Sequence, residues 1–168
     1  MKPLSSSQKA LSDAFASAEE NALSFIIFKI GGEIYGTPLL TTREVIRHRE
    51  IKPTPYMVPH FKGVINLRGQ IVSVIDLRIK FQLPCDESQS LILIVESEHG
   101  LLGAVVDDLV SVETIQQTQI DQTASIETKV PVEFFLGIAK LEDRLVNMVD
   151  ISGCLSSEDL RVLASSAS

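Results

Sequence analysis

The chain has 168 residues, 45% of them hydrophobic and 5% aromatic, with a formal net charge of −7. An acidic chain of this size can bury one good core or two small ones, and it offers no broad basic face to nucleic acids or anionic membranes. The longest apolar runs, 91–95 and 101–106, are far shorter than the roughly 20 residues that cross a bilayer. Since an apolar signal core is lacking and Cys85 and Cys154 are the only cysteines, the sequence predicts a soluble cytoplasmic protein.

The first elements in chain order are an N-terminal helix and a β hairpin. Apolar residues recur at helical spacing in the extension 1–24, which we expect to be an amphipathic helix or a flexible tail. These residues are Leu11, Ala14, Phe15, Ala18 and Ala22. Gly31-Gly32 then joins two β-type runs, 25–30 and 33–37. Because a Gly-Gly pair accepts positive φ, this pattern predicts a tight hairpin.

The remaining elements are short β runs separated by turn residues. Segment 38–47 shows no clean period, and the next strand pair, 64–67 and 70–77, turns at Arg68-Gly69. After a linker at 80–90, we expect a hairpin, a further strand, a surface loop, a second strand pair and a C-terminal helix. The expected ranges are 91–96 and 101–106 for the hairpin, 110–115 for the strand, 116–128 for the loop and about 156–165 for the helix.

A sequence repeat divides the chain into two similar halves. Residues 61–77 reappear as 135–151 at a constant offset of 74, and the match places Asp76 on Asp150. Short β runs joined by turns, without alternating helices, predict two small antiparallel barrels or strongly coiled sheets. A surface formed between two such units is a natural place for binding. The halves are expected to span about 25–80 and 91–151.

Sequence motifs for catalysis and cofactor binding are missing. The chain has no nucleophile elbow, zinc-protease motif, phosphate-binding loop or dinucleotide loop. His48, His60 and His99 have no partner at metal-ligand spacing. We therefore expect no cofactor, no metal and no enzymatic activity.

Asp76 and Asp150 offer the strongest enzymatic alternative, because aspartic peptidases bring one Asp from each of two halves to a shared site. Such enzymes need a small residue and a glycine directly after each Asp, whereas Leu77-Arg78 and Ile151-Ser152 follow here. We expect each Asp to end a strand and to accept hydrogen bonds from the backbone of the next turn. Asp107-Asp108, which superficially resemble a phosphoacceptor pair, are expected to be solvated strand-end carboxylates.

A longer pattern in the first half is similar to a known family. The run INLRGQIVSVIDLRIKF at 65–81, preceded by Phe61-Lys62-Gly63, Tyr35-Gly36 and Arg43-Glu44-Val45, strongly resembles the CheW family of chemotaxis coupling proteins. The resemblance extends over about 25–163. It implies a single all-β domain with peripheral helices, made of two intertwined, SH3-like, five-stranded barrels that are related by pseudo-two-fold symmetry.

The resemblance also implies a non-enzymatic adaptor without a cofactor. Its expected partners are the regulatory domain of a CheA-like histidine kinase and the helical tips of methyl-accepting chemoreceptors, with no nucleic acid. Membrane association would be indirect, through receptors assembled in arrays. The chain departs from the family at Ser73, where relatives frequently have proline, and at Thr41-Thr42, where they are more apolar. These departures and the unmatched N-terminal extension leave open another chemosensory system, such as one that controls type IV pili.

The resemblance carries over nine candidate protein-binding residues, which are Glu44, Val45, Gly63, Asn66, Arg68, Gly69, Val105, Val106 and Gly137. Glu44 and Arg68 are expected to pair and to shape the coupling surface, although an exposed pair can also be a structural feature that contributes about 0 to 1 kcal/mol. The valines either line a receptor groove or belong to the barrel cores. Gly63 and Gly137 either admit a partner closely or are strand and bulge glycines. The opposite charge of Glu142 at the second copy of the Arg68 turn favours a functional role for Arg68.

Overall fold

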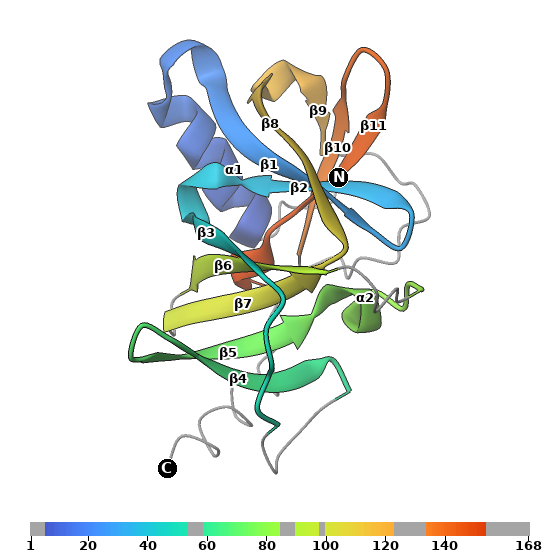
Figure 1. Ribbon diagram of the computed structural model, residues 1–168. Helices are drawn as coiled ribbons and strands as arrows, with labels where there is room; N and C mark the ends of the chain where they lie inside the picture. The colour runs from blue at the N-terminus through green and yellow to red at the C-terminus, as the bar shows by residue number, and fades with distance from the viewer. Residues whose placement is uncertain (1–5, 54–58, 85–89, 98–99, 123–133, 154–168) are drawn as a thin grey trace.

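The computed structural model describes residues 6–53, 59–84, 90–97, 100–122 and 134–153, and every structural statement below refers to these residues. Two twisted β-sheets lie one above the other, and one helix, α1 (Ser6–Ser17), packs beside the upper sheet (Figure 1). None of the described helices is long and apolar enough to cross a membrane. The expected all-β architecture of two barrel-like units with peripheral helices is confirmed.

One sheet has six strands and the other has five. The six-stranded sheet has the order β8-β1-β2-β11-β10-β9, and the five-stranded sheet has the order β3-β6-β7-β5-β4. The sixth strand of the larger sheet is the two-residue β9, so that sheet exceeds the expected five strands by one short edge strand. The strands of the larger sheet are β1 (Ala22–Ile30), β2 (Glu33–Pro38), β8 (Asp108–Gln116), β9 (Ile120–Asp121), β10 (Phe135–Lys140) and β11 (Leu145–Val149). Those of the smaller sheet are β3 (Thr42–Arg47), β4 (Phe61–Leu67), β5 (Gln70–Asp76), β6 (Leu91–Ser97) and β7 (Gly100–Val106).

The two halves of the sequence exchange their first hairpins. The β1–β2 hairpin of the first half lies in one sheet with β8, β10 and β11, whereas the β6–β7 hairpin of the second half lies with β3, β4 and β5. Each exchange is closed by a parallel strand pair, in which Gly36 lies opposite Met148 and Gly103 opposite Val74. Each sheet is therefore assembled from both halves of the repeat, which explains how two barrels can be intertwined.

The core joins the sheets through apolar residues from both of them. In its largest cluster, Tyr35 of β2 stacks on Phe28 of β1 and on Phe81, which follows β5, at ring-centroid distances of 6.1 and 5.8 Å. Burial, helped by the neighbouring Glu33 carboxylate, raises the pKa of Tyr35, whose hydroxyl donates to Glu33 Oε2 at 2.7 Å. The Tyr35 ring therefore belongs to the core, and its hydroxyl is hydrogen-bonded to Glu33.

Helix α1 completes the core of the six-stranded sheet. Its Leu11 and Phe15 are buried in a cluster with Phe25 of β1, and the Phe15 and Phe25 ring centroids are 6.1 Å apart. Ser7 Oγ also donates to Asp150 Oδ2 at 2.8 Å. The extension is therefore a helix rather than a flexible tail between 6 and 17, but Ala22 already belongs to β1 and not to the helix.

Replacing Leu11 by alanine tests the packing of α1. We expect the free energy of unfolding to fall by about 2 to 3 kcal/mol, the lower part of the usual range, because Leu11 also borders an open cavity and the site can relax. Urea denaturation followed by circular dichroism measures the loss. Lys9→Ala on the exposed face of α1 is the control and should change stability by less than about 0.5 kcal/mol. Equal effects of the two substitutions would show that α1 does not pack as described.

Two expected irregular segments contain regular structure. Segment 42–47 is strand β3, and its residues are all half-buried or exposed because it lies at the edge of its sheet. Part of the expected loop 116–128 is the 3₁₀ helix η3 (Gln117–Gln119) and β9. Other short helices are η1 (Glu19–Asn21), η2 (Leu39–Thr41), α2 (Leu77–Lys80) and η5 (Ile151–Gly153). Much of the expected linker and the C-terminal helix lie outside the described residues.

Candidate functional site

The paired strand-end carboxylates are structural. Asp76 is buried and accepts the Arg78 backbone N–H at 2.9 Å, and both of its oxygens accept from the Arg78 guanidinium at 3.0 Å. Asp150 accepts from Ser152 Oγ at 2.5 Å and from the Gly153 backbone N–H at 3.3 Å, besides Ser7. The expectation that each Asp bonds to the backbone of the following turn is correct, and the two carboxyls belong to separate networks.

Asp107 corrects one expectation from the sequence. It is not a solvated strand-end carboxylate, because Arg78 Nη1 donates to its Oδ1 at 3.1 Å and the Gly31 backbone N–H donates to its Oδ2 at 2.8 Å. Gly31 belongs to the β1–β2 turn of one sheet, and Arg78 follows β5 of the other. Asp107 therefore ties the two sheets together, while its neighbour Asp108 is exposed as expected.

The turn between β4 and β5 presents an exposed cation on a fixed backbone. Arg68 and Gly69 both have positive φ, +51° and +87°, as a two-residue hairpin turn requires. Asn66 Oδ1 accepts a hydrogen bond from the Gly69 backbone N–H at 2.8 Å, and the Asn66 backbone carbonyl accepts from Arg49 Nη1 at 3.2 Å. The Arg68 guanidinium pairs with Glu44 on β3, and the Arg68 side chain is 72% exposed against 26% for Glu44.

These contacts bring together four of the candidate residues, namely Glu44, Asn66, Arg68 and Gly69. Asparagine or glycine suits the first position of this turn far better than arginine, because a left-handed backbone costs a branched or long side chain about 1 to 2 kcal/mol. Backbone strain of this kind is concentrated at functional sites, so the conformation of Arg68 favours a functional role for its side chain. The four residues are the candidate contact surface.

The other five candidates occupy the interior or its margin. Val105 and Val106 are buried in the core and therefore line no open groove in this conformation. Val45 is half-buried and packs against the core beside Glu44. Gly63 and Gly137 lie at β-bulges, where their pairing with β5 and β11 shifts register. Burial and bulge geometry explain four of these residues without any partner contact.

Two exposed apolar residues lie at equivalent positions of the two repeated hairpins. Ile71 on β5 is 63% exposed and Leu145 on β11 is 57% exposed, and the 74-residue offset places one on the other. The alternation of β5, with Val72 and Val74 buried, places Ile71 on its outer side. The repeat alignment therefore already showed that these two residues are equivalent. The structure adds that both are exposed on their hairpins.

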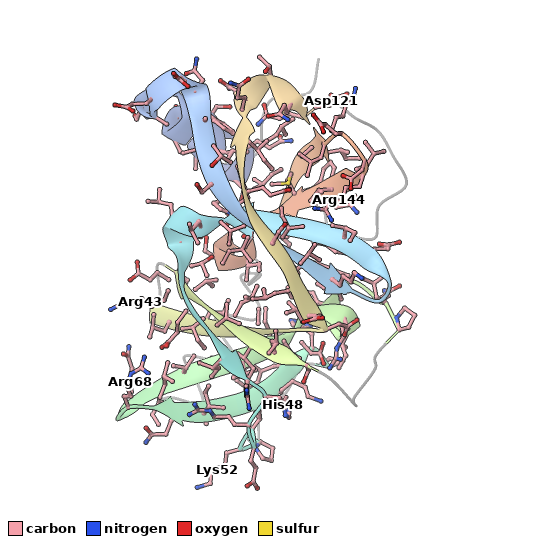
Figure 2. The ribbon with its side chains drawn as sticks, turned by 45° about the horizontal axis from the view of Figure 1, so that its top comes forward. Arg43, His48, Lys52, Arg68, Asp121 and Arg144 are labelled. Atoms are coloured by element: carbon pink, nitrogen blue, oxygen red, sulfur yellow. The ribbon has the colours of Figure 1, made fainter. Side chains whose placement is uncertain are left out.

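Opposite charges occupy equivalent positions in the two halves. Lys52 bridges to Val64 of β4 just as Asp121 of β9 pairs with Ile138 of β10, and Val64 and Ile138 are 74 residues apart. Lys52 and Asp121 are thus structural equivalents, which could not be seen in the sequence because they lie outside the repeat. Figure 2 shows Lys52 and Arg68 toward one end of the molecule and Asp121 and Arg144 toward the opposite end.

An apolar cavity of about 430 Å³ lies between α1 and η2. Its walls are mostly aliphatic, and Leu40 on its rim is strongly exposed. The described residues contain no cluster of His, Cys, Asp and Glu that could hold a metal ion. Its lining residues are Ser7, Ala10, Leu11, Ala14, Leu23, Ser24, Pro38, Leu39, Leu40, Thr41, Leu136, Asp150 and Ser152.

Two interlocked SH3-like β units, with paired carboxylates that are structural and hairpin ends that carry opposite charges, are typical of a scaffold or adaptor. The model of the CheW-like domain matches residues 24–159, which is most of the chain. The chain belongs to the CheW family of chemotaxis proteins.

Relatives and a solved structure agree with this assignment. The chain is 32% identical over 144 residues to the chemotaxis protein CheW of Helicobacter pylori, covering 83% of this chain and 85% of that one. It is 30% identical over 141 residues to the chemotaxis protein CheW of Klebsiella aerogenes, again with 83% and 85% coverage. The crystal structure of the scaffolding protein TtCheW from Thermoanaerobacter tengcongensis is similar with a TM-score of 0.75 and 27% identity, covering 82% of this chain and 94% of that chain.

Proposed function

We propose that the protein is an adaptor that couples the helical tips of chemoreceptors to the regulatory domain of a CheA-like histidine kinase. Membership of the CheW family and the scaffolding role named for a similar structure support this proposal. The adaptor works in the cytoplasm, where receptors recruit it to membrane-associated arrays. Micromolar contacts of roughly 8 kcal/mol each become effective in an array because several act together.

The exposed Arg68 on its strained turn is the observation that carries the proposal. Glu44 pairs with the guanidinium, and Asn66 closes the turn beneath it, so the cation is held in place before a partner arrives. Such preorganisation reduces the entropy lost on binding. Arg68, Glu44, Asn66 and Gly69 form the proposed contact surface, with Val45 at its margin.

Replacing Arg68 by asparagine separates binding from folding. We expect capture of at least one partner to weaken about tenfold, because the cation is lost, while the melting temperature stays the same or rises, because Asn-Gly is the preferred sequence for this turn. Pull-down and calorimetric titration with a CheA-like kinase regulatory domain and with a chemoreceptor tip fragment measure the affinity. Circular dichroism measures the melting temperature.

Arg43→Asn is the matched control for this experiment. Arg43 is also an exposed arginine of the same sheet paired with a glutamate, Glu96, but it does not lie in the hairpin turn. We expect Arg43→Asn to leave both affinities within about twofold, because Arg43 is not a candidate contact residue and an exposed ion pair contributes at most about 1 kcal/mol. Unchanged capture by Arg68→Asn would remove Arg68 from the contact surface, and a wild-type protein that binds neither partner would overturn the adaptor function.

A further inference from the structure

Helix α1 is held on the six-stranded sheet by two large apolar side chains. Leu11 and Phe15 are the large apolar residues among its twelve, and both are buried in the core cluster of that sheet. The Ser7 hydroxyl adds a hydrogen bond to Asp150. A helix of this length is marginal in water on its own, so α1 depends on this packing and should melt when it leaves the sheet.

Helix α1 leaves its site incompletely filled. Ala10 and Ala14, one turn apart on the helix, line the cavity of about 430 Å³ between α1 and η2, and Leu23 of β1 and Leu136 of β10 line it from the sheet. Protein interiors are normally close-packed, and atoms that border a void lose dispersion contacts. A helix with larger apolar residues in place of the two alanines would therefore fit this site better than α1 does.

The connection from α1 to β1 has a strained backbone. Glu20 and Asn21, which follow one another in η1, have φ of +55° and +52°. Two consecutive left-handed residues that are not glycine cost free energy, which the chain can recover if α1 is released from the sheet. Helix α1 and this connection precede the matched residues 24–159, so they are additions to the domain that the family shares. The connection is thus suited to act as a hinge.

We propose that α1 is a detachable cover on an apolar docking site, where an amphipathic helix of a partner takes its place. The bound α1 shows that this face of the sheet accepts a helix (Figure 1), and the strongly exposed Leu40 on the cavity rim offers further apolar contact. Under the proposed function, on which this inference rests, the competing helix belongs to the chemoreceptor tip. Its apparent affinity is then reduced to the extent that α1 stays docked.

Hydrogen exchange of the full-length protein measures the opening of α1. We expect the amides of α1 to become exposed at least about a hundredfold more often than those of β1, because a peripheral element can open without global unfolding. Lys9 is exposed on α1 and does not line the cavity, so it provides a matched pair of variants. Lys9→Gly should open α1 about fivefold more often than Lys9→Ala, because glycine is the poorer helix former. The exchange of β1 should be the same in both.

Calorimetric titration with a chemoreceptor tip fragment tests the competition. Since the apparent affinity follows the fraction of molecules with α1 detached, Lys9→Gly should bind the fragment about fivefold more tightly than Lys9→Ala. Both variants should bind a CheA-like kinase regulatory domain equally. A receptor helix that docked beside α1, with α1 in place, would bind Lys9→Gly no better than Lys9→Ala.

Filling the cavity from α1 should hold the cover closed. Ala14→Leu adds apolar atoms where the cavity has room, so we expect α1 to open about tenfold less often and the receptor fragment to bind about tenfold more weakly. Ala16→Leu, the same change at an exposed position of α1, is the control and should leave both values within about twofold.

Two results would overturn the proposal. One is an α1 whose amides exchange only together with those of β1, and the other is equal affinity of the two Lys9 variants for the receptor fragment. Failure of the adaptor function is a different result, in which the wild-type protein captures neither the kinase domain nor the receptor fragment. Hydrogen exchange of α1 does not depend on either partner, so the two failures can be told apart.

Discussion

Replacing Arg78 by methionine is expected to lower the free energy of unfolding by about 3 to 5 kcal/mol, the cost of removing one partner from a buried ion pair. Arg78 is buried, and its guanidinium satisfies both oxygens of Asp76 and one oxygen of Asp107. Methionine fills a similar volume but cannot donate, so the buried Asp76 and the half-buried Asp107 would lose their cation.

The effect should exceed that of a local contact because the network spans both sheets. Asp107 also accepts the Gly31 backbone N–H in the β1–β2 turn, and the backbone N–H of Asp107 donates to the Lys29 carbonyl at 2.9 Å. Losing Arg78 therefore weakens the connection between the five-stranded sheet and the hairpin that the first half contributes to the other sheet.

Urea denaturation followed by circular dichroism measures this loss in a protein that has no tryptophan. Arg43→Met is the control, because it removes an exposed arginine from an ion pair and should cost at most about 1 kcal/mol. If Arg78→Met and Arg43→Met lose the same stability, the buried network does not hold the two sheets together.

Replacing Gly63 by alanine is expected to lower the free energy of unfolding by about 3 to 5 kcal/mol, through a steric clash added to backbone strain. Gly63 has φ of +137°, which side chains rarely adopt, and it lies at the register shift of the β4–β5 pair. A Cβ atom there would overlap the Lys52 carbonyl oxygen and lie 2.7 Å from its carbon and 2.9 Å from Pro53 Cα. Backbone atoms cannot move aside as a flexible side chain can.

Gly69→Ala is the matched control for this substitution. Gly69 also has positive φ, at +87°, but a Cβ there would meet nothing within 4 Å. Its alanine variant should therefore lose only the conformational term of about 1 to 2 kcal/mol. The difference between the two unfolding free energies isolates the clash. If both variants lose the same stability, the close approach of Lys52 to Gly63 is wrong.

The local elements were largely predictable from the sequence. Gly31-Gly32 and Arg68-Gly69 do form tight turns, with positive φ at both positions of each pair. Strands with a buried face could be recognised by their apolar residues. Strand β3 was missed because none of its residues is fully buried, so its sequence shows no alternation of apolar and polar residues. The family resemblance placed Glu44 and Arg68 together, and the structure shows them paired.

Other parts of the site could not be obtained from the sequence. Val105 and Val106 could have lined a groove or filled the core, and only three-dimensional packing shows that they are buried. Asp107 follows a strand, as a solvated carboxylate would, but its partners Arg78 and Gly31 are distant in the chain. Lys52 and Asp121 became equivalent only through their bridges to β4 and β10.

The sequence by itself determined that this protein is an all-β chain with a duplicated unit, because turns and apolar strands are encoded by neighbouring residues. Only the tertiary structure decided which strands share a sheet. The parallel pairs β2–β11 and β5–β7 join segments far apart in the chain, and they place each first hairpin in the sheet of the other half. No local pattern distinguishes this exchange from two separate barrels, since both would bury the same strand faces.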